Sequence, residues 1–189
     1  LVTMLFSCLP AYGKGLDFLE QHFTREINIL ITDGWLEKRN ATYSHQLAAI
    51  HDSIVDELLI EHVRLYSRTL KGTIKKYFSF AARNTLISSC IRSFERISDI
   101  SELSGFDFSA VLTEVINELP DDMVISDFNL GKSSLISEED FVFLLSNKRF
   151  NDYVLSDDFW IVLIELLGKK EGGIVNEEVK KKIINFLNN

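Results

Sequence analysis

The segment IVDELLIEHVRLYSRTLKGTIKKY, residues 54–77, decides the fold class that the sequence predicts. Its apolar residues recur in steps of three or four, which is the period of one face of an α-helix. Gly72 interrupts the pattern at a cost of about 1 kcal/mol relative to alanine. The pattern predicts a helix over about 42–81, roughly 60 Å long, with a break near 51–53 or at Gly72 as the alternative. The stripe consists of Val55, Leu59, Val63, Tyr66, Leu70, Ile74 and Tyr77.

The segments on both sides of this stretch carry the same helical period. Apolar residues in steps of three and four from Leu16 to Leu30 predict a helix that ends at TDG, residues 32–34. A further helix is expected over about 84–97, where the apolar residues again fall on one face. The first half of the chain is therefore expected to consist of long amphipathic helices.

The second half of the chain shows explicit helix starts and stops. Residues 98–107 have the composition of a linker. Asp107 or Ser109 is then expected to open a helix that ends at Pro120, because proline cannot continue a helix. Further short helices are expected at N-capping residues followed by acidic first turns, at Ser137, Ser156 and Asn176.

Together these patterns predict an all-α protein, a helical bundle with long N-terminal helices and shorter C-terminal helices. Only two prolines occur and β-hairpin signals are scarce. We expect residues 1–97 to form the long-helix portion and residues 98–189 an acidic short-helix portion. The length of 189 residues fits a single domain in which the two portions pack together.

The charge is unevenly divided between these two portions. The net charge is −8, but residues 1–97 hold 12 Lys and Arg against 10 Asp and Glu, a balance of +2. Residues 98–189 hold 8 against 18, a balance of −10. The two portions are thus expected either to attract each other or to face different partners.

Two cysteines, Cys8 and Cys90, have no zinc-ligand spacing and form no disulfide framework. We interpret them as buried free thiols of a protein in a reducing compartment. No apolar run reaches the roughly 18 residues that a membrane-spanning helix needs. The sequence therefore predicts an intracellular, cytoplasmic protein with no membrane span, and neither a cofactor nor a metal is expected.

The stretch RNATYSH, residues 39–45, holds the one candidate catalytic constellation. Arginine, an adjacent polar residue and a histidine a few positions further on resemble the motif of the HEPN ribonucleases, an all-α superfamily. The resemblance implies metal-free RNA cleavage at the ribose 2′-hydroxyl, in which His45 moves the proton, Arg39 holds the phosphate and Asn40 orients the histidine. In the alternative interpretation, Asn40 caps a solvated helix start and Arg39 is a surface charge.

A second candidate site is a basic ridge formed by Arg64, Arg68, Lys71 and Lys75. Their steps of 4, 3 and 4 place them on one face of the predicted helix. Such a row is typical of a solvated helix face, but it also fits RNA or another phosphate ligand, an acidic protein partner, or the acidic second half of this chain.

We therefore expect a non-enzymatic α-helical module for protein–protein interaction or assembly. Its partner would be another protein or further copies of the chain. A metal-free HEPN-type endoribonuclease acting on RNA through Arg39, Asn40 and His45 is the alternative.

Overall fold

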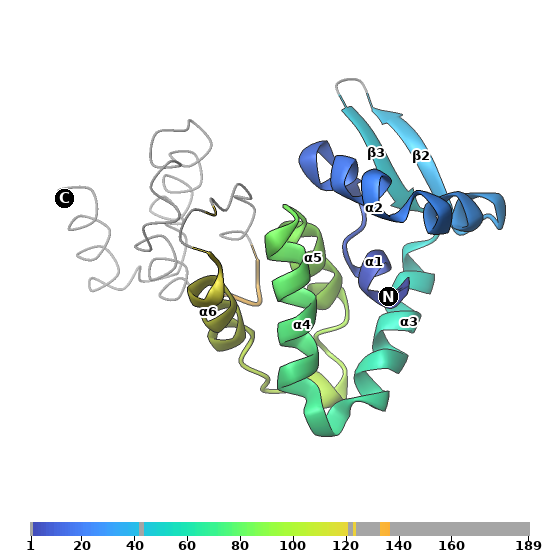
Figure 1. Cartoon of the computed structure of the whole chain (residues 1–189). Coiled ribbons are helices and arrows are strands. Elements are labelled where there is room, and N and C mark those ends of the chain that lie inside the picture. The colour runs from blue at the N-terminus through green and yellow to red at the C-terminus, as the bar shows by residue number, and fades with distance from the viewer. Residues whose placement is uncertain (1, 42–43, 121–122, 124–132, 137–189) are drawn as a thin grey trace, which may run out of the picture.

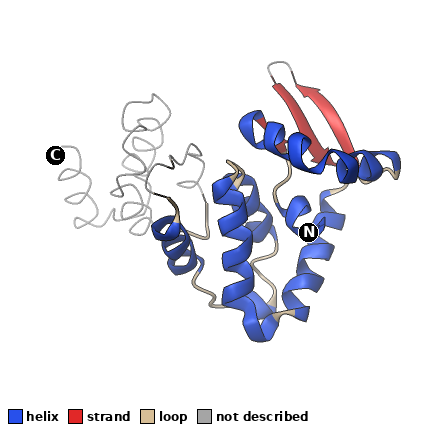
Figure 2. Cartoon of the chain, viewed as in Figure 1, coloured by secondary structure: helices blue, strands red, loops and turns tan. Residues whose placement is uncertain are grey.

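The computed structural model describes residues 2–41, 44–120, 123 and 133–136 (Figure 1). In this part of the chain, six α-helices and two short 3-10 helices accompany one three-stranded antiparallel sheet (Figure 2). The described part of the chain is therefore mostly helical but contains a sheet, so the prediction of a purely all-α fold is wrong. The short helices expected at Ser137, Ser156 and Asn176 lie outside the described residues.

The elements follow one another as α1 (Val2–Ser7), β1 (Ala11–Tyr12), α2 (Gly13–Thr32), β2 (Leu36–Ala41), β3 (Ser44–Ala49), α3 (Asp52–Leu65), η1 (Ser67–Thr69), α4 (Leu70–Arg83), α5 (Ile87–Arg96), η2 (Ser101–Leu103) and α6 (Phe108–Glu118). Helices α4 and α5 lie at the centre, with α6 on one side and α1 and α3 on the other (Figure 1). Helix α2 and the sheet form one end of the molecule.

Aromatic side chains fill the centre of the core. Phe94 of α5 is fully buried and meets three other rings, with centroid distances of 5.5 Å to Tyr77, 5.6 Å to Phe78 and 6.0 Å to Phe108. These contacts join α4, α5 and α6. Three of the 14 phenylalanines of the chain thus help to build the helical core.

Instead of the long helix expected over 42–81, residues 44–49 form strand β3 and two helices follow, the first of which begins at Asp52, at the alternative break expected near 51–53. Helix α3 ends at Leu65, the chain turns through η1, and α4 returns along the core (Figure 1). Gly72 lies inside α4 and causes no break. The turn has a tertiary cause, because one straight helix of that length could not bury both halves of its apolar stripe in a compact core. The buried residues of the two halves are Val55, Leu59 and Val63 on α3 and Ile74, Tyr77, Phe78, Ala81 and Ala82 on α4.

Residues 36–49 form a β-hairpin where a helix start was expected. The sheet has the strand order β1-β3-β2, and the β2–β3 register runs from Leu36 opposite Ala49 to Ala41 opposite Ser44. Strand alternation turns Leu36, Leu47 and Ala49 toward one face, where all three are buried. An ion pair of 2.6 Å between Lys38 Nζ and Glu20 Oε1 ties the same face to α2.

The other predicted helices agree with the structure. The helix expected over 16–30 is α2, and the helix expected over 84–97 is α5. Asp107 is the N-cap of α6 and accepts a hydrogen bond from the backbone N–H of Ala110 at 2.8 Å. Helix α6 ends before Pro120, as the proline predicts.

Cys8 and Cys90 are free and buried, as predicted. The Oγ of Ser7 lies 3.9 Å from each of their sulfur atoms. Burial raises the pKa of the Cys90 thiol well above its ordinary value, which keeps the thiol protonated. None of the helices in the described ranges combines the length and the apolarity that crossing a bilayer requires.

Candidate functional site

Asn40 and His45 form a directly opposed pair near the tip of the β2–β3 hairpin. The Nδ1 atom of His45 lies 2.7 Å from the Oδ1 atom of Asn40, within hydrogen-bond distance. Both residues are exposed. This contact is compatible with the orienting role that the HEPN resemblance implies for Asn40.

Arg39 does not join this pair. It lies opposite Gln46, and strand alternation turns the side chains of Arg39 and Gln46 to the face opposite that of Asn40 and His45. Its Nε donates to the Glu37 carboxylate at 2.5 Å. The structure thus brings together two of the three predicted catalytic residues, and neither Asn40 nor Arg39 stands at a helix start.

The basic ridge spans the corner between α3 and α4 and is not one helical face. Arg64 belongs to the last turn of α3, Arg68 to η1, and Lys71 and Lys75 to α4. The row of charges is therefore bent where the chain turns. The expected straight ridge depended on the continuous helix, which the structure does not contain.

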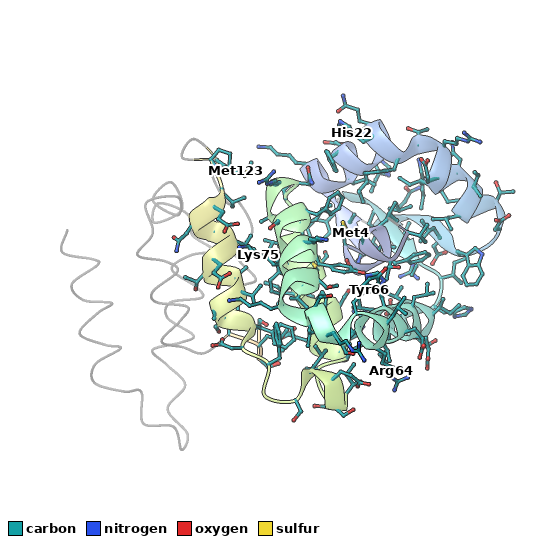
Figure 3. The ribbon with its side chains drawn as sticks, turned by 60° about the horizontal axis from the view of Figure 1, so that its bottom comes forward. Met4, His22, Arg64, Tyr66, Lys75 and Met123 are labelled. Carbon is teal, nitrogen blue, oxygen red and sulfur yellow. The ribbon has the colours of Figure 1, made fainter. Side chains whose placement is uncertain are left out.

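Acidic side chains of the same chain pair with three of the four ridge cations. Lys75 Nζ lies 2.6 Å from Glu118 and 3.4 Å from Glu114, and Lys71 pairs with Glu114 as well. Figure 3 shows Lys75 between α4 and α6. The hydrogen bond with Lys71 lowers the pKa of the Glu114 carboxyl, and the bond with Glu118 raises the pKa of Lys75.

Arg64 forms the remaining pairs of the ridge. It donates to Glu61 at 2.8 Å and lies 3.4 Å from Glu102. Glu102, Glu114 and Glu118 lie within residues 98–120, so the ridge pairs with carboxylates that follow it in its own chain. Arg68 is exposed at the corner, and no carboxylate of the described residues lies within ion-pair distance of it.

A groove of about 400 Å³ opens between α3 and α4, with α1 at one wall. We call it the α3–α4 groove. Its volume lies in the range of small ligand-binding clefts. Two of its lining residues, Met4 and Tyr66, are labelled in Figure 3. The lining residues are Met4, His62, Tyr66, Thr69, Gly72, Thr73, Lys76 and Tyr77.

The lining of the α3–α4 groove combines aromatic rings with one positively charged side chain. The ring centroid of His62 lies 4.7 Å from that of Tyr66 and 5.6 Å from that of Tyr77. Partial burial lowers the pKa of His62, which favours the neutral imidazole. Lys76 lines the groove and, like Arg68, lacks an ion-pair partner in the part of the chain that the structure describes. The groove is thus apolar with a positive rim.

Apolar side chains extend this groove along α3. Leu58, His62 and Leu65 follow the helical period on one side of the helix. Leu65 is 75% exposed, more than any other large apolar side chain of the described residues. Tyr66 was predicted to belong to the core stripe, but it is 44% exposed and forms a wall of the groove.

Two backbone features border the groove. A Cβ atom at Gly72 would meet nothing within 4 Å, so this side of α4 faces open space. The turn at η1 separates the ends of α3 and α4, which creates the corner between them. His62 stood out in the sequence only as an isolated histidine. The spacing of Leu58, Leu65 and His62 was a readable signal for an apolar flank, but the facing wall comes from another helix.

Comparisons of the chain with protein-family models, with curated proteins and with solved structures found no match.

Proposed function

We propose that the chain is a non-enzymatic protein–protein interaction module that binds an acidic, partly apolar segment of a partner in the α3–α4 groove. The supporting observation is the 75% exposure of Leu65 beside an open groove. Exposed apolar residues around a concave site are typical of protein interaction surfaces.

The charges around the groove indicate the chemistry of the partner. The cations Arg64, Lys71 and Lys75 already pair with carboxylates of this chain. Lys76 and Arg68 remain available for an acidic side chain of a partner. An apolar side chain of the same segment would contact Tyr66 and Leu65, where burial of apolar surface contributes about 25 cal/mol per Å².

Site-specific photo-crosslinking in the cells that make the protein tests this proposal. A photoreactive amino acid at position 65 is expected to yield discrete adducts with another protein. The same amino acid at Arg25, an exposed residue of α2, is expected to yield none. The exchange Lys76→Glu should abolish the adducts, whereas Arg92→Glu on the exposed side of α5 should leave them. Adducts that are absent at position 65, or that are indifferent to Lys76→Glu, contradict the proposal.

The alternative, a HEPN-type endoribonuclease, is favoured by one observation, the 2.7 Å contact between His45 and Asn40. It would also need Arg39 beside the imidazole, and Arg39 lies on the other face of the hairpin. Cleavage of a fluorescent RNA in the presence of a metal chelator separates the two functions. Chelator-resistant cleavage that His45→Ala abolishes would support the nuclease, and unchanged cleavage in that variant excludes the site.

A further inference from the structure

The thiols of Cys8 and Cys90 meet in the core of the protein. The Oγ of Ser7 lies 3.9 Å from each sulfur atom, so both sulfurs border the same hydroxyl. Burial is the main cause that raises the pKa of the Cys90 thiol, and a hydrogen bond with the Cys8 thiol adds to it. The two thiols are therefore hydrogen-bonding neighbours, although they come from segments far apart in the sequence.

Small polar side chains hold the segment that carries Cys8 against α5. The Oγ of Ser89 on α5 donates to the carbonyl of Pro10 at 2.7 Å, and Ser7 Oγ donates to the carbonyl of Met4 at the same distance. Ser7 and Ser89 are both buried. Helix α1, which ends directly before Cys8, packs between α5 and α3 (Figure 1). Contacts on both sides of Cys8 thus keep it beside α5.

We propose that Cys8 and Cys90 are a redox-active pair, which a low-molecular-weight disulfide such as oxidised glutathione converts into an internal disulfide. The sulfur atoms of a disulfide lie about 2 Å apart, so the bond draws together two atoms that are already neighbours. The chain holds two cysteines in all, so no other internal pairing competes. Neither cysteine lines the α3–α4 groove, and the inference therefore goes beyond the proposed function and does not depend on it.

The reaction consists of two successive thiol–disulfide exchanges. The Cys8 thiol gives its proton to water, and its thiolate attacks one sulfur of the oxidised glutathione, whose S–S bond breaks. The first glutathione leaves as a thiolate and takes up a proton. The Cys90 thiol then loses its proton and attacks the sulfur of Cys8, which releases the second glutathione in the same way. Two protein thiols are oxidised, and one glutathione disulfide is reduced to two thiols.

Opening of α1 controls the access of the oxidant to this pair. Both cysteines are 0% exposed in the folded protein, and a buried, protonated thiol is unreactive. Helix α1 has six residues, too few to be stable without its packing. Local detachment of this segment exposes Cys8, while α5 keeps Cys90 in the core. The return of the segment to α5 then brings the mixed disulfide to Cys90.

The disulfide is expected to stabilise the folded protein. It would close a loop of about 80 residues in the unfolded chain, which lowers the conformational entropy of that state. We expect the thermal midpoint of unfolding to rise by about 10 °C on oxidation. A thiol reductant should cleave the bond and restore the original midpoint. The pair thus supplies a reversible stabilising bond that forms under oxidising conditions.

Incubation of the native full chain with excess oxidised glutathione, followed by denaturation, alkylation and mass spectrometry, tests the proposal. The expected product has lost two hydrogen atoms, carries neither an alkyl group nor glutathione, and yields a linked Cys8–Cys90 peptide after proteolysis. Cys8→Ser and Cys90→Ser should form no internal bond, and oxidation should not raise their thermal midpoints. Three results contradict the proposal: two thiols that survive many half-times of oxidation of the urea-unfolded chain, glutathione retained on either cysteine, or a disulfide between two chains.

A pair of matched variants tests the role of α1. Leu5 on α1 and Leu112 on α6 are similarly buried, so both exchanges to alanine leave a cavity, but only Leu5→Ala loosens α1. Under conditions in which circular dichroism shows both variants folded, Leu5→Ala should be oxidised at least about tenfold faster than Leu112→Ala. Equal rates would show that global unfolding exposes the thiols, which contradicts the role of α1. Lys76→Glu, which tests the groove, should leave the oxidation unchanged, so the two proposals fail independently.

Discussion

Lys75 on α4 and Glu118 on α6 lie 2.6 Å apart between Nζ and Oε1, and the same lysine reaches Glu114 at 3.4 Å. Residues separated by about 40 positions in the sequence thus meet along two neighbouring helices (Figure 3). Lysines of residues 1–97 thus form ion pairs with glutamates of α6, the first α-helix of residues 98–189. At least part of the uneven charge distribution in the sequence therefore serves contacts within the chain.

The exchange Glu114→Gln tests this contact between α4 and α6. Lys71 and Lys75 lower the pKa of Glu114 in the folded state below its ordinary value of 4.5. The carboxylate therefore contributes stability above pH 4.5, and the contribution disappears as the pH falls through the lowered folded-state value. We expect a small loss of unfolding free energy in Glu114→Gln at about pH 7 that shrinks with salt and vanishes in acid, measured by urea unfolding. The exposed Glu57→Gln serves as the control, and an equal effect of both exchanges would refute the assignment.

Phe94→Ala tests the aromatic centre of the core. The side chain is fully buried and contacts three rings on α4 and α6. Its removal leaves a cavity and should lower the free energy of unfolding by about 3–5 kcal/mol. The half-buried Phe106, exchanged to alanine, should cost clearly less. Thermal and urea unfolding of both variants measure the difference, and equal losses would contradict the described core.

Replacement by alanine is expected to change the free energy of unfolding in opposite directions at Gly15 and Gly72. A Cβ at Gly15 would lie 2.5 Å from Leu86 Cδ2 and 3.0 Å from the Thr85 carbonyl oxygen. Gly15→Ala should therefore destabilise the protein by about 1–3 kcal/mol through overpacking. At Gly72, inside α4, a Cβ meets nothing within 4 Å, and Gly72→Ala should stabilise by up to about 1 kcal/mol. Unfolding curves of the two variants check the signs, and a shift in the same direction for both would count against this packing.

His62 predicts a pH dependence of stability near neutrality. Partial burial lowers its folded-state pKa below the ordinary value of 6.5. Below pH 6.5 the His62 imidazole therefore binds a proton more readily in the unfolded chain than in the folded protein. The free energy of unfolding is highest above pH 6.5 and decreases as the pH falls toward the folded-state pKa. His62→Gln should flatten the dependence of unfolding free energy on pH in this window. The exposed His51→Gln should not, and a flattening by His51→Gln alone would exclude the assignment to His62.

Local signals accounted for the helices that the sequence predicted correctly. Asp107 has its capping partner three residues away, and Pro120 ends α6 by its own backbone chemistry. The period of α2 is likewise contained within its own residues. These features depend only on residues close to them in the sequence, so they could be predicted without knowledge of the rest of the fold.

The hairpin was missed because its main cause is not local. Leucine, alanine, glutamate and lysine between residues 36 and 49 favour a helix on propensity alone. Residues 36–41 show no alternation of apolar and polar residues, and no glycine or asparagine–glycine turn marked a hairpin. Strand β1, which pairs with β3 through Ala11 and Tyr12, comes from more than 30 positions earlier. In the sheet, the backbone N–H and C=O groups of β3 form hydrogen bonds with other strands. In a helix, the same groups would have bonded to residues four positions away.

The same division applies to the candidate sites. The sequence determined which side chains are available, among them the His45 and Asn40 pair, the basic residues 64–75 and the exposed leucines of α3. Tertiary structure decided their use, because the hairpin pleat separates Arg39 from His45 and the turn at η1 folds one apolar stripe into two walls of a groove. The physical reason is that helical period and capping are set by neighbours within one or two turns, whereas the pairing of strands and the burial of a long stripe are decided by the whole chain minimising its exposed apolar surface.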